Sequence, residues 1–355
     1  MPFTFGEMVI ALVDSGRKSA TYKLATLLAL IDVVTAKTRI DDPSPGIVSG
    51  REVGRRVIEL YWPQTADYRG HPLRQSAQND IPAKLARWRQ IHGLEPEASL
   101  EDARRAKPDE WLQLEADLVG IVIGMPLAKL QRFGDGRHAA EERFIYQFGW
   151  RDEVKPKTVA RADFDDSLIL QPRVGKWLVQ LAPLLRPLVQ TKWAALVARQ
   201  NQDVVDIHQL DEFLFGATRI SLDRVRAPLV EAQHGRCFYC RLPMRAAEVD
   251  HFLPWSRYPD NTLDNLVAAH RTCNGAKSAS IAALEHLEAW CERFHEGAVE
   301  QIATDTGWPR RRDRSIGATT ATYVGLPNHT RLWLRGQEYE RVESKRIQGC
   351  LQTLT

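Results

Sequence analysis

Two short cysteine and histidine motifs constrain this chain more than any other feature of its sequence. Two residues separate Cys237 from Cys240 in CFYC, and two separate His270 from Cys273 in HRTC. Side chains with this spacing converge on one point, and the two pairs together offer the four nitrogen and sulfur ligands that tetrahedral zinc takes. A site with four protein ligands has no open position for a substrate, so the predicted zinc is structural.

The segment between the two motifs has the pattern of two strands and a helix. AEVDHFLPW predicts a strand that ends at a proline, RYPDNT predicts a loop, and NLVAA predicts a second strand. A helix is expected from Cys273 to Lys277. Asp250 and His251 are neighbours in the first strand, so their side chains should point to opposite faces.

These motifs, in this order, resemble the HNH endonucleases, the zinc-containing branch of the ββα-metal nucleases. The family pattern is Cys-x-x-Cys, Asp-His, Asn-Leu and Cys-x-x-Cys-(His or Asn)-x-x-Lys. It stands here as CFYC, Asp250-His251, Asn265-Leu266 and HRTCNGAK. His270 replaces the usual cysteine, and because a neutral imidazole is a competent zinc ligand, the site keeps its ligands and changes its charge.

The resemblance implies roles for residues between the two cysteine and histidine motifs and directly after the second one. Asp250 and Asn274 would hold one divalent cation over the scissile phosphate, and such oxygen donors favour Mg²⁺ or Mn²⁺. His251 suits the general base because its ordinary pKa, near 6.5, lets it accept a proton at neutral pH. In the family, the residue matching Asn265 braces the loop that bears the base. Simpler interpretations stay open: a surface Asp-His pair, a turn at Asn265 and a helix cap at Asn274.

Contacts with nucleic acid are harder to assign from the sequence. The three candidates are basic and close to the motif: Lys277, which matches the family's lysine, Arg271 and Arg257. Residues 236–277 hold six Arg or Lys against four Asp or Glu, a surplus of two, which is small for a DNA duplex. Further contacts are expected from PRRRDR (309–314) and SGRKSATYK (15–23), although each also fits an exposed polar surface.

The rest of the chain predicts a mainly α protein. Residues 1–225 form a large helical region with a predicted hinge near 134–173, residues 226–296 form the small zinc-stabilised ββα module, and residues 297–355 form a short α/β extension.

Individual elements are also predicted. Ser49 should cap a helix through Leu60, and RFIYQFGW and SLILQP could be strands. Pro183 and Pro187 should split a long apolar pattern into two helices. TTATYVGLP and TRLWLRG suggest a hairpin near the end of the chain.

Composition adds little about partners. The net charge of +3 argues neither for nor against a polyanion. The first residues make a poor signal peptide, and no apolar run is long enough to insert into a membrane, so a cytoplasmic location is expected.

The sequence therefore predicts a metal-dependent HNH endonuclease that cleaves DNA, by nicking or double-strand cleavage, with RNA not excluded. The alternative is a zinc-stabilised nucleic-acid-binding or adaptor protein without cleavage activity. By analogy alone, residues 1–225 suggest an effector of bacterial anti-phage defence or of a mobile element that is gated by a regulatory protein or ligand.

Overall fold

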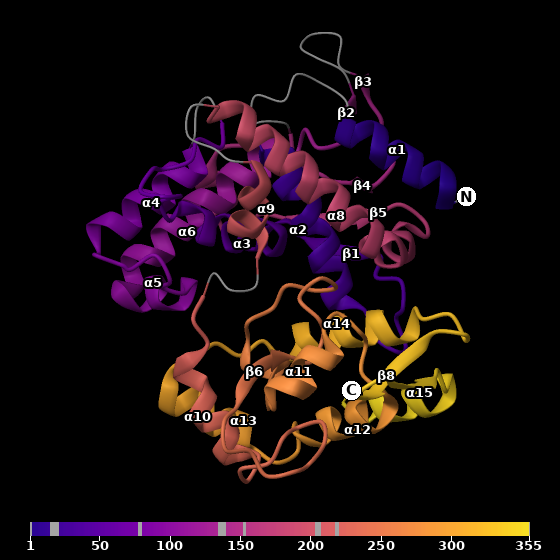
Figure 1. The fold of residues 1–355 in the computed structure, drawn as a ribbon. Helices are drawn as coiled ribbons and strands as arrows, with labels where there is room; N and C mark the ends of the chain where they lie inside the picture. Colours follow the sequence, from indigo (N-terminus) through magenta and orange to yellow (C-terminus); the bar gives the residue numbers. More distant parts are fainter. Residues whose placement is uncertain are drawn as a thin grey trace. The chain divides into compact units, whose positions relative to one another are not determined.

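The fold is predominantly helical, as predicted, and divides into two compact units (Figure 1). The first unit comprises Met1–Val34 and Ser44–Ile220, and the second comprises Thr35–Pro43 and Ser221–Thr355. The computed structural model describes residues 2–14, 21–76, 80–133, 140–151, 154–202, 207–216 and 220–354.

The first unit has a helical core. Leu27, Leu28 and Ile31 of α2 are buried at helical spacing. The predicted cap is confirmed at α3, where the side-chain oxygen of Ser49 accepts from the Glu52 backbone N–H and Glu52 accepts from the Ser49 backbone N–H. Its helices are α1 (Pro2–Asp14), α2 (Tyr22–Lys37), α3 (Gly50–Tyr61), η1 (Trp62–Thr65), α4 (Asp80–Ile91), α5 (Leu100–Ala106), α6 (Pro108–Val122), η2 (Ile123–Leu127), α7 (Pro156–Val159), α8 (Val174–Gln200) and α9 (Ile207–Phe215).

Short strands complete the first unit. The strands predicted in RFIYQFGW and SLILQP are present as β4 (Tyr146–Gln147) and β5 (Ser167–Leu170), and β5 lies between β4 and β1 (Ile47–Ser49) in an antiparallel sheet. A second pair joins β2 (Arg132–Phe133) to β3 (Ala140–Glu141). The predicted hinge at 134–173 falls in this unit and stays a prediction, since residues 134–139 and 152–153 lie outside the described residues.

The prediction of two helices around Pro183 and Pro187 was wrong. α8 continues through both prolines as one helix. Each proline removes one backbone hydrogen bond from the helix. Because the prolines stand four residues apart, the bond lost at Pro187 is the one to the carbonyl of Pro183. Leu178 and Trp193, on either side of the prolines, are fully buried, and this packing holds the helix together across the interruption.

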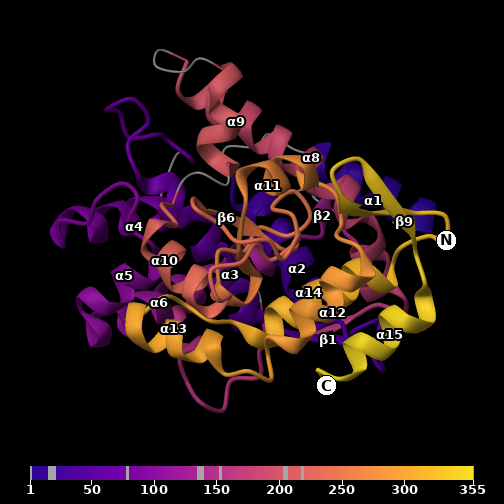
Figure 2. The same cartoon turned by 60° about the horizontal axis from the view of Figure 1, so that its bottom comes forward.

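The second unit contains the predicted strand–loop–strand–helix order. Its first strand β6 (Glu248–His251) pairs antiparallel with β7 (Leu266–Ala269). Figures 1 and 2 both show α11 (Arg271–Lys277) beside β6. The other elements are α10 (Asp223–Ala232), η5 (Leu263–Asn265), α12 (Leu284–Glu292), α13 (Ala298–Thr306), α14 (Arg312–Val324), β8 (Arg331–Arg335), β9 (Glu338–Arg341) and α15 (Ser344–Gln352).

The predicted C-terminal hairpin is only half correct. β8, from TRLWLRG, pairs with β9, which follows it directly. TTATYV belongs instead to α14, where Ile316, Ala318 and Tyr323 face the core. A helical period in this segment was overlooked because its threonines favoured a strand.

A short segment from early in the chain belongs to the second unit. Residues 35–43 pack against α14, where a Cβ atom at Gly317 would lie 1.7 Å from the carbonyl oxygen of Ala36. Only glycine permits this approach. Separately, none of the helices in the described ranges combines the length and apolar character needed to cross a membrane.

Candidate active site

The four predicted zinc ligands come together in the second unit. Cys237, Cys240, His270 and Cys273 place their ligand atoms within 4.8 Å of one another. The Nδ1 atom of His270 lies 3.2 Å from the sulfur of Cys240, and its Nε2 atom lies 3.1 Å from the carbonyl oxygen of Pro243. A carbonyl only accepts hydrogen bonds, so Nε2 carries the proton and Nδ1 offers its lone pair to the cysteine group. This donor set fits a structural zinc ion.

Asp250 and His251 lie on opposite faces of β6, as predicted. Asp250 is opposite Val267 in the strand pair, and His251 is opposite Leu266. The carboxylate of Asp250 contacts Tyr239 and Lys277, whereas the imidazole of His251 contacts Asn261. One strand end thus carries two chemically different side chains, each held by its own partners.

Among the described residues, only one carboxylate oxygen of Asp250 has partners. Its Oδ2 accepts from the Tyr239 hydroxyl at 2.5 Å and lies 2.9 Å from the Lys277 ammonium. Within the described ranges no donor contacts Oδ1. The two contacts fix the orientation of the carboxylate, so the arrangement suits a ligand that binds a cation through Oδ1.

Asn274, in α11, has a similar division between its two polar atoms. Its Nδ2 donates to Oε2 of Glu248 at 2.9 Å, while its Oδ1 has no protein partner in the part of the chain that the structure describes. Glu248 stands two residues before Asp250, on the same face of β6. Oxygen donors of this kind fit Mg²⁺ or Mn²⁺. The sequence analysis missed Glu248, although the alternation in EVDH could have revealed it.

The three predicted nucleic-acid contacts differ in accessibility. Lys277 is fully buried and also donates to the backbone oxygen of His251 at 2.8 Å, so this geometry does not favour a phosphate contact. The side chain of Arg271 is 90% exposed, 3.5 Å from Glu248. Arg257 is half-buried in the loop after β6. All three contacts stay predictions.

His251 is buried and held by one hydrogen bond. Its Nε2 lies 2.7 Å from Oδ1 of Asn261. Because an amide oxygen accepts, Nε2 carries the proton and Nδ1 is the basic nitrogen. Burial lowers the pKa of His251 below its ordinary value, although Asn261 and the charges of Asp250 and Asp260 oppose this effect. The imidazole is therefore neutral, and basic, at neutral pH.

Asn265 ties together the loop that follows His251. Its Oδ1 accepts from the Leu253 backbone N–H at 2.8 Å, and its Nδ2 donates to the carbonyls of Leu253 and Asp260, both at 3.1 Å. The residue is only 2% exposed. This geometry suits a positioning residue rather than one that contacts the substrate.

The C-terminal segment also braces this loop. Asp264 accepts from the guanidinium of Arg310 and from the Arg311 backbone N–H. Ser315 donates to Asp260, and the indole of Trp308 donates to the Asn261 carbonyl at 2.7 Å. Part of PRRRDR is thus structural rather than free for nucleic acid. Of the other basic segment, residues 15–20 lie outside the described residues.

Comparison with known proteins bears on this site. The family model HNH_4, described as HNH endonuclease, matches residues 239–283, which contain β6, β7 and α11. No characterised protein and no solved structure matches the chain. The predicted resemblance is confirmed over these residues, and the chain contains an HNH endonuclease domain built around residues 239–283.

Proposed function

We propose that the protein hydrolyses phosphodiester bonds of DNA with the help of one divalent cation, Mg²⁺ or Mn²⁺. The observation that carries this proposal is the end of β6. There Tyr239 and Lys277 hold one carboxylate oxygen of Asp250, and Asn261 holds one ring nitrogen of neighbouring His251. Among the described residues, the other carboxylate oxygen and the other ring nitrogen have no hydrogen-bond partner. A side chain with one polar atom fixed by the protein and the other available is already oriented to act on a ligand.

The cation would be held by Asp250 and Asn274, and when bound it stabilises the negative charge that builds up around phosphorus. Nδ1 of His251 takes a proton from the attacking water. The water oxygen bonds to phosphorus, the bond from phosphorus to the 3′ oxygen breaks, and that oxygen takes a proton from solvent, so the products carry a 5′-phosphate and a 3′-hydroxyl. Glu248 keeps the Asn274 amide oriented, and Lys277 keeps the Asp250 carboxylate oriented.

A plasmid-nicking assay on the zinc-loaded full chain tests this function. Nicking should require Mg²⁺ or Mn²⁺, stop with a chelator and fall strongly in His251→Ala. The exposed His295 provides a matched control, since His295→Ala should nick at the wild-type rate. A protein that binds DNA but does not nick it with either cation would support the alternative of a binding or adaptor protein, and a parallel RNA substrate tests the preference for DNA.

A wider role extends this proposal. The HNH endonuclease family model matches only residues 239–283, so the whole of residues 1–225 lies before the matched segment. An unrestrained nuclease would endanger its host's DNA. We propose that the protein is a cytoplasmic anti-phage effector whose N-terminal region restrains cleavage until a regulatory protein or ligand binds. Such a switch needs a difference in binding free energy of only a few kcal/mol.

The design of a truncated protein follows from the fold. A fragment starting at 226 would lack part of α10 and the segment 35–43 that packs against α14. Residues 221–355 should therefore carry segment 35–43 on a flexible linker. If this fragment binds zinc and melts cooperatively but nicks no faster than the full chain at equal salt, the restraint hypothesis is wrong.

A further inference from the structure

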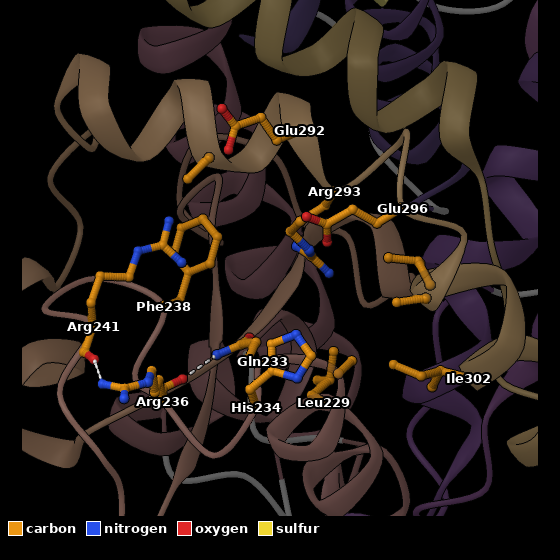
Figure 3. A pocket seen from close by; sticks show the side chains of 14 residues that line it. Leu229, Gln233, His234, Arg236, Phe238, Arg241, Glu292, Arg293, Glu296 and Ile302 are labelled. Atoms are coloured by element: carbon orange, nitrogen blue, oxygen red, sulfur yellow. Dashed lines mark hydrogen bonds between the residues drawn. The ribbon is translucent and has the colours of Figure 1, made fainter.

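A cavity of about 190 Å³ lies in the second unit between α10, the CFYC turn, α12 and α13 (Figure 3). Much of its wall is apolar and includes Leu229, Phe238 and Ile302. An engineered cavity of about 150 Å³ with such a lining accommodates benzene. The cavity is therefore large enough for a ring-sized apolar group.

One polar group in this cavity lacks a partner. Nη1 of Arg293 is buried and has no hydrogen-bond partner among the described residues, and Nη2 makes only a long contact, 3.5 Å, to the Leu263 carbonyl. Figure 3 shows the Arg293 side chain reaching toward the middle of the labelled residues. Burial lowers the pKa of this guanidinium to about 10. A buried cation with an unused N–H is costly unless an anion satisfies it.

The side chains that line the cavity carry a small formal surplus of positive charge, although the carboxylates of Asp264 and Glu296 also act on Arg293. Three arginines (236, 241 and 293) and two glutamates (292 and 296) line the cavity, a formal surplus of 3 − 2 = +1. Arg236, Arg241, Glu292 and Glu296 are exposed to water, which screens their charges, whereas Nη1 of Arg293 is buried. Arg241 and Arg293 lie 5.3 and 5.9 Å from the centroid of the Phe238 ring, so both guanidiniums stand next to the apolar wall.

We propose that this cavity binds a small carboxylate with a compact apolar body, the carboxylate at Arg293 and the body against Phe238, Leu229 and Ile302. The site is separate from the candidate active site, but it includes Gln233, which exchanges two hydrogen bonds of 2.8 Å with Ala268 of β7. An occupant would therefore rest against a side chain that anchors the strand pair.

Binding of benzoate to the zinc-loaded full chain tests this site. Titration calorimetry should show benzoate binding at least tenfold more tightly than benzamide, its neutral analogue, and more tightly than acetate, which lacks the apolar body. Arg293→Gln should abolish the preference for benzoate over benzamide. Ile302→Trp should fill the cavity and prevent binding while leaving Arg293 in place, and Arg312→Gln, at an exposed arginine, should change nothing.

Three results would overturn the proposal. They are failure of benzoate to bind, equal affinity for benzoate and benzamide, and undiminished binding by Ile302→Trp. None of them depends on nuclease activity.

A second, independent observation concerns two cysteines outside the zinc group. The sulfur atoms of Cys291 in α12 and Cys350 in α15 lie 2.8 Å apart, and both are free thiols. Cys291 is 3% exposed and Cys350 is half-buried. The contact between the two sulfur atoms lowers the pKa of Cys350, while that same contact and burial raise the pKa of Cys291. Cys350 is the more accessible of the two thiols.

We infer that Cys291 and Cys350 form a reversible disulfide when a peroxide is present. The Cys350 thiolate attacks one peroxide oxygen, which gives a sulfenic acid and, after protonation, water. The sulfur of Cys291 then attacks the sulfenic sulfur, the S–S bond forms, and hydroxide leaves with the Cys291 proton as a second water. The two thiols lose two electrons, and the peroxide accepts them.

Peptide mapping after treatment of the zinc-loaded chain with hydrogen peroxide tests this inference. A linked peptide containing Cys291 and Cys350 should appear, and the melting temperature of the second unit should rise by roughly 5–10 °C, since the link closes a long loop. Dithiothreitol should reverse both effects, and Cys350→Ser should show neither. The inference is wrong if both thiols remain free, or if Cys350→Ser gains the same stability on oxidation.

Discussion

Each of the two units contains a buried aspartate with a buried positive charge beside it, and the two sites differ in whether the second carboxylate oxygen is also bound. In the first unit Asp32 is fully buried, and both its oxygens are taken: Arg56 donates to Oδ2 at 2.7 Å and Arg186 donates to Oδ1. In the second unit Lys277 and Tyr239 contact only Oδ2 of Asp250.

This difference separates a structural carboxylate from one available for chemistry. Despite its burial, the two arginines lower the pKa of Asp32, so the group is a fixed anion within a closed ion cluster. Asp250 is oriented just as firmly but keeps one acceptor for a ligand. Burial and ion pairing alone do not distinguish the two aspartates, whereas the hydrogen-bond partners of each carboxylate oxygen do.

The largest expected effect concerns zinc and should appear in the second unit alone. Protein purified without added metal should contain about one zinc per chain, and Cys237→Ser or Cys273→Ser should unfold the module, because zinc binding contributes on the order of 10 kcal/mol to such folds. Elemental analysis and calorimetry measure this. A zinc-free chain with an unchanged melting profile would rule out the site.

Exchange of each buried aspartate for asparagine tests the comparison itself. Asp250→Asn should reduce metal-dependent nicking by roughly 10²-fold or more with a modest change in stability. Asp32→Asn should instead lower the free energy of unfolding by about 3–5 kcal/mol, because it leaves two buried arginines without their partner. Nicking rates and denaturant unfolding of both variants provide the measurement. If each variant showed the other's effect, the distinction between the two sites would be lost.

The sequence predicted the zinc-ligand group of the second unit but not the Asp32 ion cluster of the first unit, and the reason is physical. Cys237, Cys240, His270 and Cys273 are tied to one another by ligand geometry, so their spacing alone predicted the group that the structure brings together. Asp32, Arg56 and Arg186 come from three helices whose packing depends on the whole core, and no local pattern links them.

The same distinction holds inside the HNH domain. The strand order and the opposite faces of Asp250 and His251 follow from local periodicity. The bond between Asn261 and His251, the burial of Lys277 and the bracing by Trp308 depend on how distant segments pack. Sequence spacing does not carry that information.

Loss of the hydrogen bond to His251 should have a smaller effect than loss of the base. Asn261→Ala frees the imidazole to rotate and to exchange its proton between nitrogens, so we expect roughly a tenfold lower kcat with little change in KM. Asn261→Asp keeps an acceptor and should restore most of the rate. Nitrogen NMR of the His251 ring reports the tautomer directly, and an unchanged tautomer in Asn261→Ala would remove this role.

The pH dependence is expected to be the mildest effect. Since burial lowers the pKa of His251 below about 6.5, the neutral base persists through neutral pH, and kcat/KM should fall only as pH drops through that lowered value. Protonation also favours the unfolded state, so the stability contributed by His251 is present above about pH 6.5 and is lost as pH falls through the folded-state pKa. Nicking and melting profiles between about pH 5 and 8 measure both, and an acid limb centred well above 6.5 would assign the base to another group.

Plasmid nicking by the wild-type chain and by His251→Ala, with and without Mn²⁺, tests the central claim most directly. The account predicts that the wild-type protein nicks only when the cation is present, and that His251→Ala, folded and loaded with zinc, is slower by roughly 10²-fold or more. Nicking by His251→Ala at nearly the wild-type rate, or equal nicking with and without cation, would contradict it.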